Sequence, residues 1–290
     1  MTVRSRIAPT PSGLLHEGNA YNFLLTWALV RAQGGELTLR IDDIDRDRCK
    51  PEYLEALFQD LHWLGIDWNL GPQSVEEQNA LQQWKHIDRY REALDSLEKK
   101  ALVFSCSCSR KDLESIDVYP GTCLKSPATH PPYAWRFKPE IPSEIELLSL
   151  NGLPETIRFD SSMQHSVIWR KEDLPAYHLV SVMEDQWAGT NLVVRGQDLL
   201  SSSLFQHALA DALGDLNYAQ IRYVHHPLIK DKHGHKLSKS KGSLALRHLR
   251  EKERSPEALL LRFCEWMKFD RATGSILELP QLLAESLLRK

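Results

Sequence analysis

The N-terminal segment of the chain constrains the fold most, because three regular elements and two turns follow one another there. Thr2–Ala8 is predicted to be a strand, and the stretch P-S-G-L-L-H-E-G-N at Pro11–Asn19 is predicted to be a turn. Apolar side chains at helical spacing predict a helix over Asn19–Gln33, which Gly34-Gly35 would end. A second strand is predicted at Glu36–Ile41, and the order strand, helix, strand is typical of a parallel sheet with crossover helices.

The rest of the chain continues this pattern on both sides of an interruption. Helices are expected from Pro51 to about Leu64 and over roughly Val75–Lys99, with the proline as a first helical residue. From Leu102 to about residue 165, prolines and cysteines break the pattern, so an insertion is expected there. The elements expected after the insertion are Ser166–Arg170, Tyr177–Gln186, Thr190–Arg195, Ser202–Leu213, Ile221–Lys230 and Glu257–Met267, with further helical periodicity near the end.

Composition and charge limit the classes of function. No window approaches about 18 uninterrupted apolar residues and the N-terminus lacks signal-peptide architecture, so a membrane span is excluded and a cytoplasmic location is expected. The formal net charge of −3 gives no overall basic field, so any nucleic acid would have to bind a local patch. One candidate patch, equally typical of a solvated surface, is formed by Lys230, Lys232, Lys236, Lys239 and Lys241.

Two segments far apart in the sequence carry the residues needed to hold a triphosphate. His16 lies where a strand feeds a helix, and free backbone N–H groups at a helix N-terminus bind phosphate. The segment K-L-S-K-S at Lys236–Ser240 adds two ammonium groups, which neutralise charge that develops during phosphoryl or nucleotidyl transfer. Alone, His16 is typical of a satisfied surface histidine, and only the pair of segments indicates ATP chemistry.

The cysteines favour a metal site over disulfides. Three of the five, Cys106, Cys108 and Cys123, cluster in the sequence, whereas Cys49 and Cys264 are isolated and are interpreted as structural. Two thiolates two residues apart clamp one face of a tetrahedral ion, and a third returns after a loop. Free thiols remain the alternative at this point, and the fourth ligand position stays open.

Six separated motifs, in this order, resemble those of class I aminoacyl-tRNA synthetases of the glutamyl group. They are R-I-A-P-T-P-S-G from Arg6, L-H-E-G-N from Leu15, R-I-D-D-I-D from Arg40, Y-H-L from Tyr177, V-R-G-Q-D from Val194 and K-L-S-K-S from Lys236. The resemblance extends from about residue 3 to residue 245. It implies that the carboxylate of an amino acid attacks the α-phosphorus of ATP, bound with Mg²⁺, and that pyrophosphate leaves.

The resemblance assigns roles to residues of both phosphate-binding segments. His16, Lys236 and Lys239 are expected to be catalytic, with Lys239 the stronger candidate for direct ATP contact. Gly18 is expected to let the adenosine approach the backbone closely. The complete set of expected ATP-binding residues is His16, Gly18, Asn19, Lys236, Leu237, Ser238 and Lys239.

The same resemblance implies a pocket for L-glutamate. Arg6 and Arg195 would pair with the side-chain carboxylate, because guanidinium forks bind carboxylates directionally. Where the family reads R-I-E-D, this chain reads R-I-D-D, so Asp42 would hold the substrate ammonium with a shorter side chain, or else cap the following turn. The expected glutamate-binding residues are Arg6, Ile7, Ala8, Pro9, Thr10, Asp42, Tyr177 and Arg195.

The cysteine-bearing insertion narrows the resemblance. The pattern C-x-C…Y-x-x-x-C is similar to the zinc site of glutamyl-queuosine tRNA(Asp) synthetases, in which a tyrosine oxygen is the fourth ligand. This implies one structural Zn²⁺ held by Cys106, Cys108, Tyr119 and Cys123.

The fold class implied is α/β, a Rossmann-type parallel sheet with an inserted zinc-bearing subdomain and a short C-terminal helical segment. The expected nucleotide-binding catalytic domain is discontinuous, over residues 1–100 and 166–245. The zinc-containing acceptor-type insertion would cover residues 101–165, and the helical segment residues 246–290. No anticodon-binding domain of the kind that full glutamyl-tRNA synthetases carry is expected.

Three readings of the function follow. The favoured one is ATP-dependent activation of L-glutamate and its transfer to queuosine, a modified base in the anticodon of tRNA(Asp). The second is a truncated glutamyl-tRNA synthetase that charges a tRNA 3′ end, and the third is a non-catalytic tRNA-binding paralogue. A small-molecule nucleotidyltransferase such as pantothenate synthetase is disfavoured by the two arginines and the cysteine-bearing insertion. No obligate protein partner is expected.

Overall fold

The computed structural model describes residues 2–114, 116, 118–138, 144–149, 153–158, 163–215, 218–229 and 245–287. The chain forms two compact units. The first unit comprises residues 1–83, 194–196 and 226–290, and the second comprises residues 84–193 and 197–225. The domain division expected from the sequence stays a prediction.

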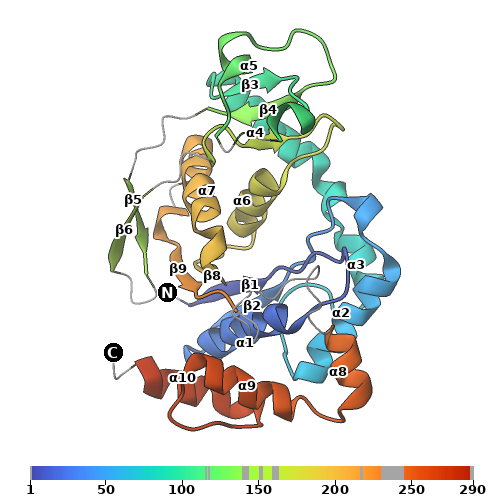
Figure 1. Ribbon diagram of the computed structural model, residues 1–290, viewed down its shortest axis with the longest axis vertical. Coiled ribbons are helices and arrows are strands. Elements are labelled where there is room, and N and C mark those ends of the chain that lie inside the picture. The colour runs from blue at the N-terminus through green and yellow to red at the C-terminus, as the bar shows by residue number, and fades with distance from the viewer. Residues whose placement is uncertain are drawn as a thin grey trace. The chain divides into compact units, whose positions relative to one another are not determined.

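The first unit is built on the strand, helix and strand that the N-terminal sequence predicts. Strand β1 (Arg4–Ile7) pairs in parallel with β2 (Glu36–Leu39), and helix α1 (Glu17–Ala32) connects them (Figure 1). The register runs from Arg4 opposite Glu36 to Ile7 opposite Leu39. These elements confirm the parallel crossover arrangement expected from the sequence.

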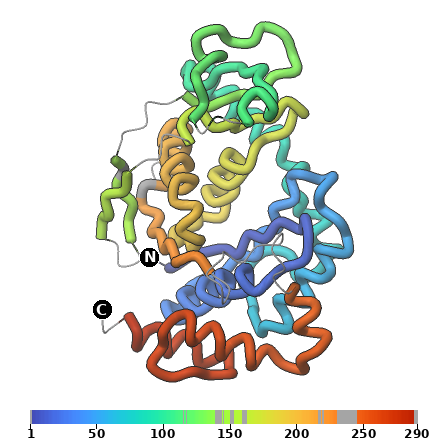
Figure 2. The backbone as a smooth tube through the Cα atoms, viewed as in Figure 1, coloured from blue at the N-terminus to red at the C-terminus, as the bar shows by residue number. Residues whose placement is uncertain are grey.

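Helix α1 is buried on nearly every side rather than along one stripe. It contacts β1 and β2, and it also contacts α10 (Leu279–Leu287) from the far end of the chain (Figures 1 and 2). Helix α9 (Glu257–Met267) adds aromatic contacts, because the Tyr21 ring lies 5.5 Å from the Phe263 ring. The C-terminal helices α9 and α10 therefore help to hold α1, the helix that begins directly after His16, in place.

Two further helices of the first unit pack together although they are far apart in the sequence. Helix α2 (Pro51–Leu64) has the predicted bounds and ends at Gly65, whose φ of 77° is left-handed. Helix α8 (Leu246–Lys252) packs against α2, and Arg250 Nε lies 3.1 Å from Asp60 Oδ1.

The prediction of one helix over Val75–Lys99 was wrong. The structure has α3 (Val75–Leu81), a 3₁₀ turn (Gln83–His86) and α4 (Ile87–Lys99). Gln82 is extended, with ψ of 132°, and the backbone N–H of Gln83 donates to the Asp43 carboxylate. Long-range hydrogen bonds thus replace helical ones at the break, and helical periodicity could not reveal them.

The second unit contains strands that the proline-rich interval hides. Strand β3 (Val103–Cys106) pairs antiparallel with β4 (Ala134–Phe137), which pairs antiparallel with β7 (Val167–Trp169). The short helix α5 (Thr122–Lys125) lies against β3. None of these three strands contains a proline. The prolines lie in the connecting segments and therefore do not disrupt the hydrogen bonds of the sheet.

Four more strands form a sheet in the order β6-β5-β9-β8. Strand β5 (Glu144–Leu148) pairs antiparallel with β6 (Pro154–Arg158) and in parallel with β9 (Arg222–His226). Strand β8 (Leu192–Gly196) completes this sheet.

Helices α6 (Tyr177–Trp187) and α7 (Leu200–Leu213) of the second unit pack on each other and on α4. Among the described residues, no helix combines the length and the apolar character needed to cross a bilayer.

Candidate functional site

The His16 turn caps the N-terminus of α1. The backbone N–H of His16 donates to Asn19 Oδ1 at 3.0 Å, and the backbone N–H of Asn19 donates to the His16 carbonyl at 2.9 Å. Asn19 thereby fixes the turn from which α1 begins at Glu17. A fixed helix N-terminus next to an imidazole can bind phosphate oxygens.

Because Gly18 has no side chain, the His16 imidazole can lie directly against its backbone. A Cβ built at this position would lie 3.0 Å from both Cε1 and Nδ1 of the His16 imidazole, and 3.9 Å from Ile229 Cδ1. The imidazole therefore lies against the bare backbone of Gly18. Close approach, rather than an unusual backbone angle, explains glycine here.

Both described neighbours of the lysine segment lie at this turn. Ala245 forms an antiparallel bridge with His16, and the backbone N–H of Leu246 donates to the Leu15 carbonyl at 2.8 Å. Ile229, the described residue that precedes the lysine segment, has its Cδ1 3.9 Å from the position of a Cβ built on Gly18. The segment between Ile229 and Ala245 lies outside the described residues. It includes four of the expected ATP-binding residues, Lys236, Leu237, Ser238 and Lys239. The two described residues that flank this segment both lie at the His16–Gly18 turn.

The ends of β1 and β2 bring part of the expected glutamate set together. The backbone N–H of Asp42 donates to the Pro9 carbonyl, and that of Arg40 donates to the Ile7 carbonyl, both at 2.9 Å. The stretch from Ile7 through Ala8 and Pro9 to Thr10 therefore runs beside Asp42 at the carboxyl ends of two parallel strands. In open α/β sheets, ligands bind outside these ends.

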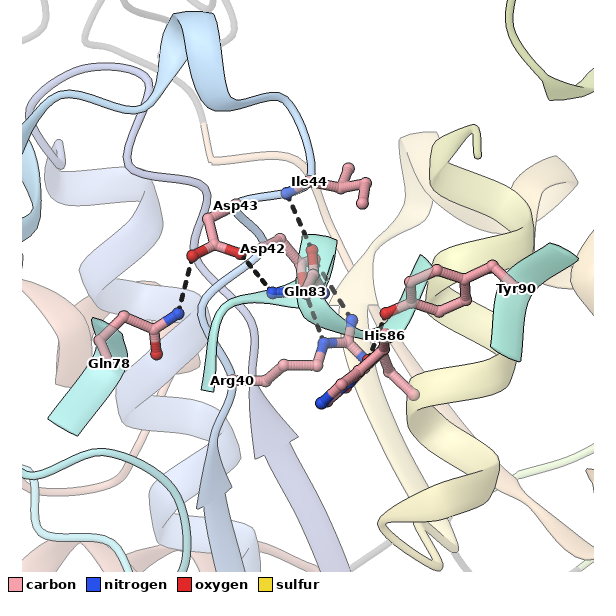
Figure 3. A network of polar contacts seen from close by, with 9 residues as sticks. Arg40, Asp42, Asp43, Ile44, Gln78, Gln83, His86 and Tyr90 are labelled. Atoms are coloured by element: carbon pink, nitrogen blue, oxygen red, sulfur yellow. Dashed lines mark hydrogen bonds and ion pairs between the residues drawn. The ribbon is translucent and has the colours of Figure 1, made fainter. Parts of the chain in front are cut away.

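Two carboxylates follow β2 and have different partners (Figure 3). Asp42 Oδ1 accepts from Arg40 Nε at 2.7 Å and from Gln83 Nε2 at 3.0 Å. Asp43 accepts from Gln78 Nε2 at 2.8 Å and from the Gln83 backbone at 2.9 Å. Burial raises the pKa of Asp43, although both hydrogen bonds oppose the shift.

The remaining residues of the expected glutamate set are placed as follows. Arg6 on β1 and Arg195 on β8 are both buried and belong to the first unit. Next to Arg195, the Val194 carbonyl accepts from Asn22 Nδ2 on α1 at 3.5 Å. Tyr177 begins α6 in the second unit, and its side chain is exposed.

Sequence reasoning missed the residues that hold the two carboxylates. Arg40 is recognisable in the sequence only as part of a motif, and Gln78 and Gln83 belong to none of the six motifs. Both glutamines are 2% exposed, and a buried amide signals a polar partner. No local pattern reveals that burial, because Gln83 lies 41 positions from Asp42 in the chain.

Three cysteines converge in the second unit, as their clustering predicts. Their Sγ atoms lie within 4.8 Å of one another, with Cys106 and Cys123 buried and Cys108 partly buried. Tyr119 Oη lies 3.4 Å from Cys106 Sγ and 3.9 Å from Cys108 Sγ, and it accepts from the Cys123 backbone N–H at 3.0 Å. Three sulfur donors at this spacing are able to hold a metal ion such as zinc.

Cys108 and Cys123 differ in the pKa of their thiols. Burial and hydrogen bonds with the other two cysteines raise the pKa of Cys108 to about 11. For Cys123, burial also favours the neutral thiol, but hydrogen bonds from Tyr119, the Ser107 backbone and the neighbouring thiols outweigh it and lower the pKa to about 6. The cluster therefore stabilises one thiolate, which is the form that binds a metal.

The α/β fold, with its parallel strands and its cysteine-bearing insertion, is that of a class I aminoacyl-tRNA synthetase catalytic domain. The chain belongs to the family described as "tRNA synthetases class I (E and Q), catalytic domain", which matches residues 2–159 and 125–275. It therefore carries the catalytic domain that defines this family of class I synthetases.

Individual relatives differ mainly in how much of their length is matched. The chain is 35% identical over 270 residues to glutamyl-Q tRNA(Asp) synthetase of Nitratidesulfovibrio vulgaris, covering 86% of this chain and 81% of that protein. It is 34% identical over 278 residues to glutamate–tRNA ligase 2 of Syntrophus aciditrophicus, but spans only 56% of that protein. The crystal structure of glutamate–tRNA synthetase from Elizabethkingia anophelis shares the fold, with a TM-score of 0.67 at 22% identity over 83% of this chain and 53% of that one.

Proposed function

We propose that this protein activates L-glutamate with ATP and transfers it to queuosine in the anticodon of tRNA(Asp). The observation that carries the activation step is the meeting of Ala245, Leu246 and Ile229 with the His16–Gly18 turn. These contacts support the proposal that the lysine segment and the N-terminus of α1 bind the phosphates of one ATP molecule.

In the proposed first step, a carboxylate oxygen of glutamate attacks the α-phosphorus of ATP. The bond between the α-phosphorus and the bridging oxygen breaks, and pyrophosphate leaves with that electron pair, so the product is glutamyl-adenylate. His16 would hydrogen-bond phosphate oxygens, and Lys236 and Lys239 would balance the negative charge that develops. Mg²⁺ would accompany the nucleotide as it does in phosphoryl transfer generally.

The proposed glutamate pocket uses the ends of β1, β2 and β8. Arg6 and Arg195 would pair with the side-chain carboxylate, and Asp42 would bind the α-ammonium. Tyr177 stays in the proposed glutamate-binding set through its place in the family motif alone. Positioning of the two anionic reactants is expected to account for most of the rate enhancement.

For the metal, we propose zinc held by Cys106, Cys108, Cys123 and Tyr119. The donor set fits this ion, since three sulfurs within 4.8 Å of one another and the Tyr119 phenol oxygen, 3.4 Å from Cys106 Sγ, would supply four donors. A closed shell leaves no position for substrate, so zinc would stabilise the insertion rather than take part in the reaction.

For the acceptor, we propose the modified anticodon base rather than the 3′ end. The tyrosine-containing donor set supports this choice, as does the match over 81% of a relative that carries the glutamyl-Q tRNA(Asp) synthetase name. In the second step a nucleophile of the base would attack the acyl carbon of the adenylate, and AMP would leave. Splayed bases of single-stranded loops are the usual targets of sequence-specific RNA recognition.

The decisive experiment supplies labelled glutamate, ATP and tRNA(Asp) from cells with and without queuosine synthesis. Label is expected only on the queuosine-containing tRNA and should remain after the 3′ terminus is removed by nuclease. Label lost with the 3′ terminus would identify a 3′-charging enzyme, the reading that the glutamate–tRNA ligase relatives favour.

A third outcome would favour a non-catalytic paralogue. In that case neither labelled tRNA nor glutamate-dependent exchange of pyrophosphate into ATP would be detected. The observation that favours this reading is the ion pair of Asp42 with Arg40, because Arg40 competes with the substrate ammonium for the same carboxylate.

A further inference from the structure

Gln83 lies at the centre of the polar network that follows β2 (Figure 3). Its side-chain Nε2 donates to Asp42 Oδ1 at 3.0 Å, and its Oε1 accepts from the Ile44 backbone N–H at 3.1 Å. Its own backbone N–H donates to Asp43 Oδ1 at 2.9 Å. One buried residue thus binds three consecutive residues and fixes the path of the chain beyond β2.

The two oxygens of Asp42 are not equivalent. Oδ1 accepts two hydrogen bonds, from Arg40 Nε at 2.7 Å and from Gln83 Nε2 at 3.0 Å. Oδ2 lies 3.3 Å from Arg40 Nη2, a weaker contact. A carboxylate oxygen has two lone pairs, so Oδ1 is filled by these donors and Oδ2 keeps acceptor capacity. The Asp42 side chain is 14% exposed, which leaves it accessible to a small cation.

We propose that Gln83 is a positioning residue that keeps Asp42 Oδ2 available for the α-ammonium of the amino acid. The inference rests on the proposed activation of an amino acid. An arginine fork can take both oxygens of a carboxylate in two equal, parallel hydrogen bonds, whereas Arg40 donates unequally to the two oxygens of Asp42. By occupying Oδ1, the Gln83 amide holds the pair in its asymmetric form, with contacts of 2.7 and 3.3 Å.

The neutral amide suits this role for an electrostatic reason. A second cation at position 83 would repel the incoming ammonium, and a carboxylate there would repel Asp42. A fixed Asp42 also avoids part of the entropy cost of ordering a side chain when the substrate binds.

The test is the Michaelis constant for the amino acid in pyrophosphate exchange by Gln83→Met. Methionine keeps the length of the side chain but donates no hydrogen bond. The amino acid KM is expected to rise by roughly tenfold, the effect of a lost hydrogen bond to a charged group. The ATP KM and kcat should change by less than about twofold, because the ammonium is bound alike in the ground and transition states.

The matched control is Gln78→Met. Gln78 is as deeply buried as Gln83 and loses the same amide, but it binds Asp43 and not Asp42. Its amino acid KM is expected to stay within about twofold of the wild type. Equal increases of KM in both variants would mean that general loosening, rather than the Asp42 contact, causes the effect.

A double-mutant comparison tests whether Gln83 acts through Asp42 or only contributes to general stability. In an Asp42→Asn background, Gln83→Met should raise the KM by less than about twofold, since the group through which Gln83 acts is already altered. Independent, multiplying effects would overturn the proposal. Should Gln83→Met fail to fold, Gln83→Asn gives the same test, because its amide is too short by one methylene to keep the bond.

The outcomes distinguish the two proposals. Exchange by the wild type with an unchanged KM in Gln83→Met overturns the role of Gln83 and leaves the proposed function standing. Exchange with an amino acid other than glutamate overturns the proposed substrate, and the same KM comparison is then run with that amino acid. No exchange with any amino acid, with or without tRNA, overturns both.

Discussion

Arg262 Nε lies 2.8 Å from Glu17 Oε1, and this ion pair joins α9 to the first residue of α1. Glu17 stands between His16 and Gly18, the two residues proposed to approach ATP. Tyr21 Oη donates to the same Glu17 oxygen at 2.9 Å. The C-terminal helical segment therefore helps to position the turn, although 245 positions separate Glu17 from Arg262.

Replacing Arg262 should impair activation more than it impairs stability. The pair is partly exposed, so Arg262→Ala is expected to lower the free energy of unfolding by only about 0.5–1 kcal/mol. A loosened turn should nevertheless reduce the rate of pyrophosphate exchange by roughly three- to tenfold, since catalysis depends on positioning. Arg271→Ala, which breaks the more exposed pair with Glu278, serves as the control and should leave the rate unchanged. Equal rates in both variants would exclude a role for the Arg262 contact.

A side chain at position 18 should act through the His16 imidazole. The added Cβ in Gly18→Ala would lie 3.0 Å from the ring, so the ring must move. Exchange is expected to slow by on the order of tenfold or more. In a His16→Ala background, the same substitution should have little further effect, because the ring it displaces is gone. Measured rates that fall by the same factor in both backgrounds would show that the Cβ acts elsewhere, for example on the nucleotide directly.

Loss of the Lys239 ammonium should lower the rate of activation strongly. Lys239→Ala is expected to reduce kcat for activation by about 10²-fold or more, as with the loss of other transition-state donors. Lys252→Ala removes an exposed ammonium at the end of α8 and should have no such effect. A near-wild-type rate for Lys239→Ala in single-turnover measurements would remove this lysine from the mechanism.

Local sequence patterns predicted the helices whose ends are marked by neighbouring residues. They did not predict the features that depend on contacts between residues far apart in the sequence. The bounds of α2 and α9 match the prediction because proline, glycine and helical spacing mark them in the sequence. The break at Gln82, the strands inside the insertion and the contacts of Gln83 depend on partners far along the chain. The three cysteines were found because metal ligands leave a spacing that local reading detects.

Metal content should depend on the clustered cysteines and not on the two isolated ones. Cys106→Ser is expected to lose stoichiometric zinc and to lower the melting temperature, because the buried sulfurs lose the ion that holds them together. Cys49 and Cys264 are not members of the cluster, so Cys49→Ser and Cys264→Ser should retain the metal. Elemental analysis of the purified variants checks this. Full zinc in Cys106→Ser would contradict the ligand assignment.

Asp60 should make the stability of the protein depend on pH in an unusual direction. Its carboxyl is fully buried beside Arg250, and burial raises its pKa to about 6 even though the Arg250 hydrogen bond opposes the shift. A carboxyl with a raised folded-state pKa binds its proton more tightly in the folded state. Its contribution is therefore favourable below about pH 4 and is lost as the pH rises to about 6.

The difference in melting temperature between wild type and Asp60→Asn isolates this contribution, since the amide does not titrate. Relative to the variant, the wild type is expected to lose a few degrees between about pH 4 and pH 6. Asp67, whose pKa is lowered by Trp27 and Arg31 against the opposing effect of burial, should behave in the opposite sense. Relative to Asp67→Asn, the wild type should lose stability as the pH falls. A flat difference curve for Asp60→Asn would mean that Arg250 keeps Asp60 ionised throughout, and α8 would then be held to α2 by a permanent ion pair.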